Sequence, residues 1–292
     1  MVFHAKNYIT NRVAASKFRI LTAPHGREVS GKISLMTVGA ALITTFIWSA
    51  IIQTIFFAFA AYKKSDKVTD LSYSLSFVIL AIWLFTAGEN SLFRFAITSM
   101  VVFWGIRLGA YLFMRILAIK KDARFDGIRE NFWAFAKFWT LQGIGVWLIL
   151  IPTTVALSRT NTVELGFISI VGVVMWVIGL TVESFADAQK FMFYQHKEIS
   201  PTPWIEKGLW KYSRHPNYFG ELLVWWGIFI AVTPALLGWT WLSIVGPLSI
   251  TGLLLFVTGI PTVRKSMDKK FGDDPRYKEY LLRTRLLIPL PK

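Results

Sequence analysis

The sequence predicts an all-α integral membrane bundle of about seven transmembrane helices. Of its 292 residues, 54% are hydrophobic and 16% are aromatic, and the mean hydropathy is +0.49. Seven apolar segments approach the roughly 20 residues that a helix needs to cross a bilayer. At these lengths only helices satisfy their own backbone hydrogen bonds inside lipid. Membrane lipids are therefore the first expected partners.

The order of the apolar segments divides the chain into a short polar beginning and one membrane domain. Residues 1–34 contain six basic residues and a single acid, Glu28, which is typical of an amphipathic surface segment or a targeting extension. Residues 35–292 are expected to form a single seven-helix domain with a cytosolic C-terminal tail. The predicted spans are 35–62, 71–87, 92–119, 132–157, 163–186, 217–236 and 239–262.

The basic residues orient the bundle. The net charge is +15, but the Lys and Arg residues lie between the hydrophobic spans and after the last one, so nucleic acid is not an expected partner. The even-numbered connections carry only Arg94 and Arg159. By the positive-inside rule the odd-numbered loops and the C-terminus face the cytosol, although the basic segment 1–34 argues for the opposite orientation. The expected location is the endoplasmic reticulum in a eukaryote or the inner membrane in a bacterium.

Several kinds of site are excluded. The chain has no cysteine, which removes disulfides, thiolate metal ligands and cysteine nucleophiles, and no metal site is predicted. Gly143-Ile144-Gly145 lacks the third glycine and the preceding strand of a dinucleotide-binding fingerprint.

The most informative segment is 208–221, which places several polar side chains immediately before an apolar aromatic run. Buried polar groups need partners, and a polar ligand could supply them. Because Pro216 marks a helix start, Asn217 and Glu221 are expected on one helical face, with Tyr218 beside them. The preceding residues Lys211, Arg214 and His215 suit phosphate groups. A solvated basic loop before a hydrophobic helix is the alternative interpretation.

A second polar group lies at the end of the fifth span. Glu183, Asp187 and Lys190 follow i, i+4, i+7 spacing and share one helical face. Lys190 or an outside cation is expected to offset the repulsion between the two carboxylates. This stripe and the start of the sixth span are expected to face each other in a cavity that opens to the cytosol. A salt-bridge ladder on the helix surface is the alternative.

The third span and the tail complete the set of polar features. Arg107 and Arg115 lie within the third span, and intramembrane arginines usually face a partner or a cavity. Arg115 could instead extend towards the interface, so Arg107 is the stronger functional candidate. The basic tail after residue 263 fits a segment held at anionic lipid headgroups, or a lid over a cytosolic cofactor.

These motifs resemble the steroid 5-alpha-reductase C-terminal-domain family, and within it a branch of multi-pass membrane proteins. The similarity extends from about residue 100 to 290. It is carried by Gly208-Leu209-Trp210, Ser213, Asn217-Tyr218-Phe219-Gly220-Glu221, Arg107-Leu108, Arg124-Phe125-Asp126, the Glu183 to Lys190 block, Pro275, Tyr277 and Ile288-Pro289.

The resemblance implies a seven-helix fold that binds NADPH from the cytosolic side and reduces an activated carbon–carbon double bond in a hydrophobic small molecule. Asn217 and Glu221 match positions that hold the nicotinamide end. Asp187 matches a cofactor-binding carboxylate, and Arg107 matches a basic cofactor contact. The cofactor-binding set implied by the resemblance is Arg107, Asp187, Lys190, Trp210, Ser213, Arg214, His215, Asn217 and Glu221.

The sequence departs from the steroid reductases at two positions. Glu183 stands where they have asparagine, and Trp104 stands where they have the tyrosine that donates to the substrate carbonyl. An indole is a very poor proton source, so specificity for a 3-oxosteroid is not expected. In the predicted hydride transfer the catalytic residues are Tyr218, as donor to the carbonyl, and Glu221. Tyr111 and Trp104 are the other possible donors.

Two further functions stay open. Arg214-His215-Pro216 with Tyr218 is also similar to membrane methyltransferases that modify isoprenyl-cysteine or phospholipid amines with S-adenosylmethionine. The acidic pair typical of those enzymes is missing between Pro261 and Asp268. A non-catalytic lipid-binding relative is the third possibility.

Overall fold

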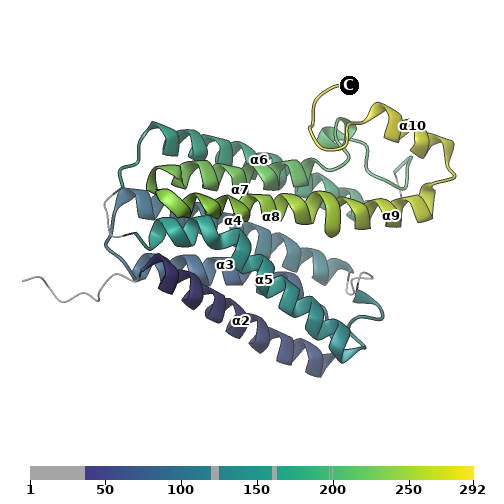
Figure 1. The fold of residues 1–292 in the computed structure, drawn as a ribbon. Helices are drawn as coiled ribbons and strands as arrows, with labels where there is room; N and C mark the ends of the chain where they lie inside the picture. The colour runs from purple at the N-terminus through teal and green to yellow at the C-terminus, as the bar shows by residue number, and fades with distance from the viewer. Residues whose placement is uncertain (1–36, 120–124, 160–162, 197, 199) are drawn as a thin grey trace, which may run out of the picture. The chain divides into compact units, whose positions relative to one another are not determined.

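A computed structural model describes residues 37–119, 125–159, 163–196, 198 and 200–292. The predicted N-terminal segment 1–34 and Arg124 of the Arg124-Phe125-Asp126 motif lie outside these residues. Residues 35–292 form one compact unit. Its regular elements in the described ranges are helices (Figure 1), and seven of them are long and apolar enough to cross a bilayer. The predicted all-α membrane bundle is thus confirmed.

The α-helices of the described residues are α2 (Val38–Lys63), α3 (Thr69–Thr86), α4 (Leu92–Ile119), α5 (Phe132–Leu157), α6 (Phe167–Gln195), α7 (Pro216–Val232), α8 (Val245–Gly252), α9 (Ile260–Phe271) and α10 (Pro275–Arg283). The first six of these follow the first six predicted spans closely, and the fifth and seventh spans differ in extent. Helix α6 continues beyond the predicted span end at 186, and its last turns carry the polar stripe as far as Gln195. The seventh span runs from Gly238 to Phe271, through 3-10, α8, π-helical (Leu253–Val257) and α9 segments.

Helix starts are fixed by local sequence. The side chains of Thr37 and Asn131 accept hydrogen bonds from Ala40 N (3.2 Å) and Ala134 N (3.0 Å) at the first turns of α2 and α5. Pro216 occupies the first turn of α7, where a missing N–H carries no penalty. This proline places Asn217 and Glu221 in the opening turns of the helix.

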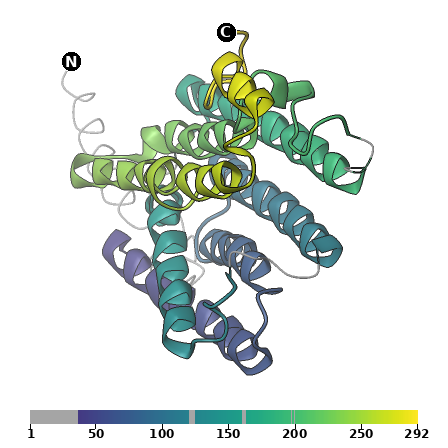
Figure 2. The same cartoon turned by 90° about the vertical axis from the view of Figure 1, so that its right-hand side faces the viewer.

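Helices α2, α3 and α5 pack together, and α6 packs along α7, while α4 and α8 join the two groups. Figure 2 shows this arrangement viewed from the end that carries α9 and α10. The α6–α7 contact is extremely close. A Cβ added at Gly179 or at Gly220 would lie 2.7 Å from the carbonyl oxygen of the other. Small residues allow such an approach between membrane helices, and here they bring the polar ends of α6 and α7 together.

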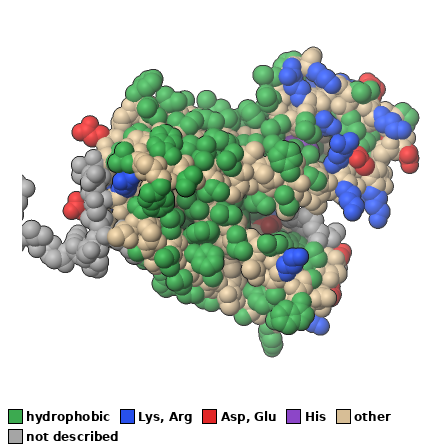
Figure 3. Space-filling model, viewed as in Figure 1, with side chains coloured by type: hydrophobic (Ala, Val, Ile, Leu, Met, Phe, Trp, Pro, Cys, Tyr) green, Lys and Arg blue, Asp and Glu red, His purple; other side chains and the backbone are tan. Residues whose placement is uncertain are grey.

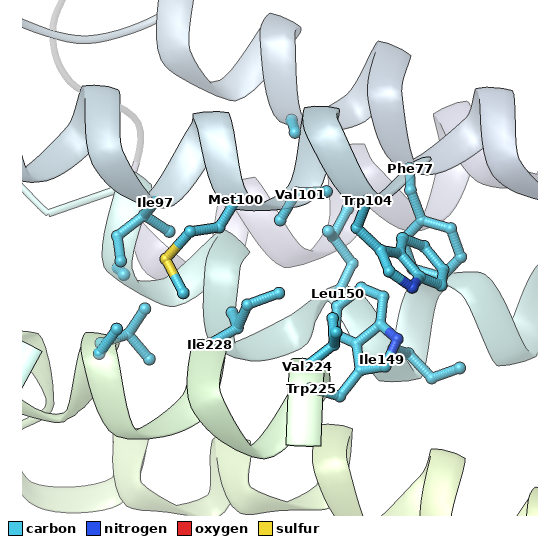
Figure 4. Close-up of a cluster of buried hydrophobic side chains, with 14 of the residues drawn as sticks. Phe77, Ile97, Met100, Val101, Trp104, Ile149, Leu150, Val224, Trp225 and Ile228 are labelled. Carbon is cyan, nitrogen blue, oxygen red and sulfur yellow. The ribbon is translucent and has the colours of Figure 1, made fainter. Parts of the chain in front are cut away.

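An aromatic core lies where α3, α4 and α7 meet. The ring centroids of Phe77, Trp104 and Trp225 are 4.8 to 5.2 Å apart (Figure 4), and each side chain is at most 2% exposed. These tilted and edge-on arrangements are the favourable ones for aromatic pairs. The core sits directly beside Arg107, because Trp104 is one helical turn before it on α4.

Several buried polar groups in the other half of the bundle are paired. Gln142 Nε2 donates to Gln53 Oε1 (2.9 Å) and Ser72 Oγ (3.1 Å), and Gln53 Nε2 donates to Ser76 Oγ (2.9 Å). Arg94, which the sequence marked only as a loop charge, is buried and donates to the Leu84 carbonyl (2.7 Å) at the end of α3. These groups therefore hold helices together.

The outer surface fits a membrane environment. Large hydrophobic side chains such as Ile43 on α2, Phe103 on α4 and Phe185 on α6 are more than half exposed. Figure 3 shows hydrophobic side chains over most of one face, with Lys and Arg gathered at the end formed by α9 and α10. This distribution agrees with a multi-pass protein in contact with lipid.

Candidate functional site

A buried ion triad joins α4 to α6. Arg107 Nη1 lies 2.6 Å from Glu183 Oε1, and Arg107 Nη2 lies 2.7 Å from Asp187 Oδ2. The Arg107 side chain is 19% exposed, while the Glu183 and Asp187 side chains are 2% and 5% exposed. The i, i+4 spacing predicted that both carboxylates share a face. Arg107, rather than Lys190 alone, offsets their repulsion, because α4 packs against that face.

The start of α7 completes this cluster. Asn217 Nδ2 donates to Asp187 Oδ1 across 3.2 Å. Glu221, one turn later, interacts electrostatically with Arg107 and Asp187. The polar ends of α6 and α7 therefore face each other as expected. We use the name acid cluster for Arg107, Glu183, Asp187, Asn217 and Glu221.

The Trp104 side chain interacts with the Glu183 carboxylate beside the acid cluster. Glu183 Oε2 and the indole Nε1 of Trp104 are both buried, and buried polar atoms are nearly always hydrogen-bonded. This interaction ties Trp104 of the aromatic core to the acid cluster.

Other aromatic side chains surround the cluster. The Arg107 guanidinium lies 5.8 Å from the centre of the Tyr111 ring. Tyr73 on α3 contacts Trp104 edge-on, with ring centroids 6.4 Å apart, and interacts electrostatically with Glu183 and Glu221. Sequence reasoning did not find Tyr73. In the sequence, Tyr73 is distinguished only as a tyrosine within the Ser-rich second span. Its proximity to the cluster depends on how α3 packs.

A cleft adjoins the acid cluster on the side of the C-terminal tail. Its volume is about 640 Å³, counting the part that is open to solvent. Lys190 from α6 and His215 beside α7 line one wall, and α9 and α10 line the other. The basic and aromatic side chains of its lining include Lys190, Trp204, Trp210, Arg214, Arg264 and Tyr277. Asp187, Asn217 and Glu221 do not line this cleft. The sequence predicted one cavity between the polar ends of the fifth and sixth spans, whereas the structure has an acid cluster and, next to it, a separate basic and aromatic cleft.

The basic side of the cleft has unused hydrogen-bonding capacity. Arg214 Nε and Trp204 Nε1 are buried without a hydrogen bond among the described residues. Lys190 Nζ lies 5.1 Å from the centre of the Trp210 ring. Arg264 projects from α9 and is exposed. Together these groups offer cationic donors beside aromatic faces.

The tail closes the cleft by backbone pairing with the segment before α7. Arg214 N donates to Arg285 O (2.9 Å), and Arg285 N donates to Tyr212 O (3.2 Å). The Ser213 hydroxyl donates to Leu287 O (2.6 Å) and is fully buried. The tail is therefore held against this segment by hydrogen bonds, and its predicted role as a lid over a cofactor stays a prediction.

Trp210 is fixed from both sides. Its indole Nε1 donates to Ala186 O (3.0 Å) and its carbonyl accepts from the Tyr280 hydroxyl (3.1 Å). In this structure Ser213 and Trp210 hold the tail against α6. Their predicted cofactor contacts stay a prediction. Of the two residues, Trp210 lines the cleft.

His215 is a neutral, buried side chain. Burial, together with the nearby charges of Lys190 and Arg214, lowers the pKa of His215 to about 3. Its ring stacks on Tyr218 with a centroid distance of 5.2 Å and an interplanar angle of 2°. A neutral imidazole at this position can donate or accept a hydrogen bond, but it adds no positive charge to the cleft at neutral pH.

Comparison with known proteins places this arrangement in a family. Residues 56–284 match the family described as protein of unknown function, DUF1295. The chain belongs to this family. An uncharacterised protein of Schizosaccharomyces pombe is 25% identical to it, over 36% of this chain and 37% of that protein. The match thus spans little more than a third of that relative. No solved structure matches the chain.

Proposed function

We propose that the protein is a membrane-embedded, NADPH-dependent reductase of a carbon–carbon double bond in a lipid, steroid-like or other enone substrate. The observation that carries the proposal is the contact between the acid cluster and the basic cleft along α6. Asp187 belongs to the first and Lys190, one turn later, lines the second. A nicotinamide nucleotide has the matching polarity, with hydroxyls and an amide at one end and phosphates and adenine at the other.

Side chains at both ends suit such a ligand. Arg214 Nε can donate to a phosphate oxygen, with Lys190 and Arg264 as further cations of the cleft. Trp204 and Tyr277 give the cleft an aromatic lining beside these cations. At the other end, Asn217 and the carboxylates of Asp187 and Glu221 suit an amide and ribose hydroxyls.

The protein's part in the reaction is positioning and electrostatics. The cofactor, when bound, supplies the hydride. A donor must hydrogen-bond the substrate carbonyl as that oxygen gains negative charge. Tyr218 stacks on His215 at the cleft side, whereas Tyr73 lies between the aromatic core and the acid cluster. We therefore add Tyr73 to Tyr218 as a candidate donor.

Ligand binding to the purified protein in detergent tests the proposal. We expect NADPH to quench tryptophan fluorescence and raise the unfolding temperature, with a weaker response to NADH. Asn217→Ala removes the bond to Asp187 and is expected to weaken NADPH binding by roughly tenfold, the effect of about one hydrogen bond to a charged group. Asn90→Ala, in the exposed connection before α4, is the matched control.

Two outcomes would contradict the proposal. A response to S-adenosylmethionine without any response to NADPH would favour the methyltransferase. No response to either compound would favour the non-catalytic lipid-binding protein.

A further inference from the structure

The C-terminal tail carries exposed apolar side chains outside both the core and the cleft. Leu282 at the end of α10, Ile288 and Leu290 are 73%, 44% and 55% exposed. The nearby side chains of Leu281 and Leu286 line the cleft, whereas these three do not. The tail also follows the last candidate membrane span. Contact with the bilayer along that span therefore does not account for the exposed side chains of the tail.

The tail is held in a compact shape by its own contacts. Lys292 Nζ donates to the Leu282 carbonyl, and Arg285 Nε donates to the Pro291 carbonyl across 3.2 Å. These bonds connect the end of α10 with the last residues of the chain. Residues 282–292 therefore turn back on themselves, so that the three exposed apolar side chains belong to one small segment.

Hydrogen bonds also fix the level of the tail relative to the membrane spans. The main chain of Arg285 pairs with residues 212–214, and the Leu287 carbonyl accepts from the Ser213 hydroxyl. Pro216, the first residue of α7, begins a candidate membrane span. Because a chain extends by at most about 3.6 Å per residue, Ser213 lies within about 11 Å of that span. The tail is thus placed near the boundary between lipid and water.

Cations accompany the apolar side chains. Lys278 lies one helical turn before Leu282 and on the same face of α10, and it is exposed, as is Arg285. Arg283 lies 3.7 Å from Glu279 and offsets the charge of that acid, so Lys278 and Arg285 add net positive charge. Figure 3 shows Lys and Arg gathered at this end of the molecule. Apolar side chains among Lys and Arg are typical of segments that lie in the membrane interface, where the cations attract anionic lipids.

We propose that residues 278–292 form a surface that binds anionic phospholipid headgroups in the leaflet beside α9 and α10. Leu282, Ile288 and Leu290 enter the interface between the lipids, and Lys278 and Arg285 contact the phosphates. This inference does not depend on the proposed reductase activity. Another protein is the competing occupant of this surface, and it would keep the apolar side chains away from lipid.

Fluorescence quenching by lipid tests the surface in the full-length protein. The chain contains no cysteine, so Leu282→Cys, Ile288→Cys and Leu290→Cys can each carry a single fluorescent label. Asp273→Cys, in the exposed turn between α9 and α10, is the matched control. Each protein is placed in nanodiscs that contain a lipid with a spin label near its headgroup. The other lipid is phosphatidylcholine alone or an equal mixture of phosphatidylcholine and phosphatidylglycerol.

We expect strong quenching at the three tail positions in the anionic nanodiscs and weaker quenching in the neutral ones. The label at position 273 should be quenched little in either. Added salt should reduce quenching of the tail in the anionic nanodiscs, because it screens the attraction between the cations and the headgroups.

Charge variants of the labelled Leu290→Cys protein make the result specific. Lys278→Gln and Arg285→Gln should each lower the ratio of bound to free tail about fivefold, the contribution of one Lys or Arg near an anionic surface. Lys269→Gln, at an exposed position of α9, changes the net charge equally and should leave the ratio nearly unchanged.

Two results would overturn the proposal. If the labels at the three tail positions are quenched no more than the label at position 273, the tail faces water or another protein. If quenching is equal in neutral and anionic nanodiscs, the charge of the headgroups does not hold the tail.

Discussion

The Arg107 guanidinium donates to the Asp187 carboxylate across 2.7 Å, joining residues that are 80 positions apart in the chain. This bond links the middle of α4 to the C-terminal half of α6, and Asn217 extends it to α7. Three helices thus meet at one polar point inside an otherwise apolar bundle. A membrane protein keeps such a group of charges chiefly where it has a function.

The first prediction concerns the stability of this triad. Arg107→Met leaves Glu183 and Asp187 buried without their guanidinium, so we expect a loss of about 3–5 kcal/mol in the free energy of unfolding. Unfolding in detergent, followed by tryptophan fluorescence, measures it. Arg159→Met, whose side chain reaches Thr240 at 3.4 Å among the described residues, should change stability little. Adding Glu183→Gln and Asp187→Asn to Arg107→Met should recover part of the loss, and an equal effect of both arginine variants would contradict the account.

The close approach of α6 and α7 gives a second prediction. A Cβ at Gly220 would lie 2.7 Å from Glu183 Cβ and from the Gly179 carbonyl oxygen, so Gly220→Ala must separate the helices. We expect a loss of about 1–3 kcal/mol from overpacking and weaker NADPH binding. Gly145→Ala on α5 is the control, because its nearest heavy atom would be 3.8 Å away. Equal thermal stability of both variants would count against the tight α6–α7 packing.

The cleft gives a third prediction, with neighbouring residues as variant and control. Arg264 lines the cleft and Lys265 does not. Arg264→Ala should weaken NADPH binding by about tenfold, through the loss of one charge-assisted hydrogen bond to a phosphate. Lys265→Ala changes the net charge equally and should leave the affinity nearly unchanged. If the two variants behave alike in a titration at physiological salt, the phosphates bind elsewhere.

The fourth prediction concerns pH. The pKa of His215 is about 3 in the folded protein, below its ordinary value of 6.5. The unfolded chain therefore takes up the proton first as the pH falls. The contribution of His215 to stability is complete above pH 6.5 and declines by up to about 1.4 kcal/mol per pH unit towards pH 3.

Substitution of His215 isolates this effect. His215→Phe keeps a ring against Tyr218 and cannot titrate. Between pH 7 and pH 5 the variant should lose roughly 2 kcal/mol less stability than the wild type. Parallel stability curves for the two proteins would show that His215 titrates normally.

The sequence predicted the helices well because their signal is local. Apolar length and charged loops located seven spans, and helical spacing placed Glu183 with Asp187 and Asn217 with Glu221. The partnership of Arg107 with both carboxylates could not be predicted from the residues alone, because it depends on which faces of α4 and α6 meet. The position of Tyr73, the hydrogen bonds of Arg94 and the pairing of residues 285–287 with the segment before α7 also depend on tertiary packing, so they could not be predicted either.

The most direct test of the reductase proposal follows the hydrogen itself. Purified protein in nanodiscs is incubated with membrane lipid extract and with NADPH that carries deuterium at the transferable position of the nicotinamide. Mass spectrometry then searches the lipids for incorporated label. The proposal predicts a lipid that has gained one deuterium from the cofactor and one proton from water, with the label absent for Asn217→Ala. Unlabelled lipids in the presence of folded protein and bound NADPH would contradict it.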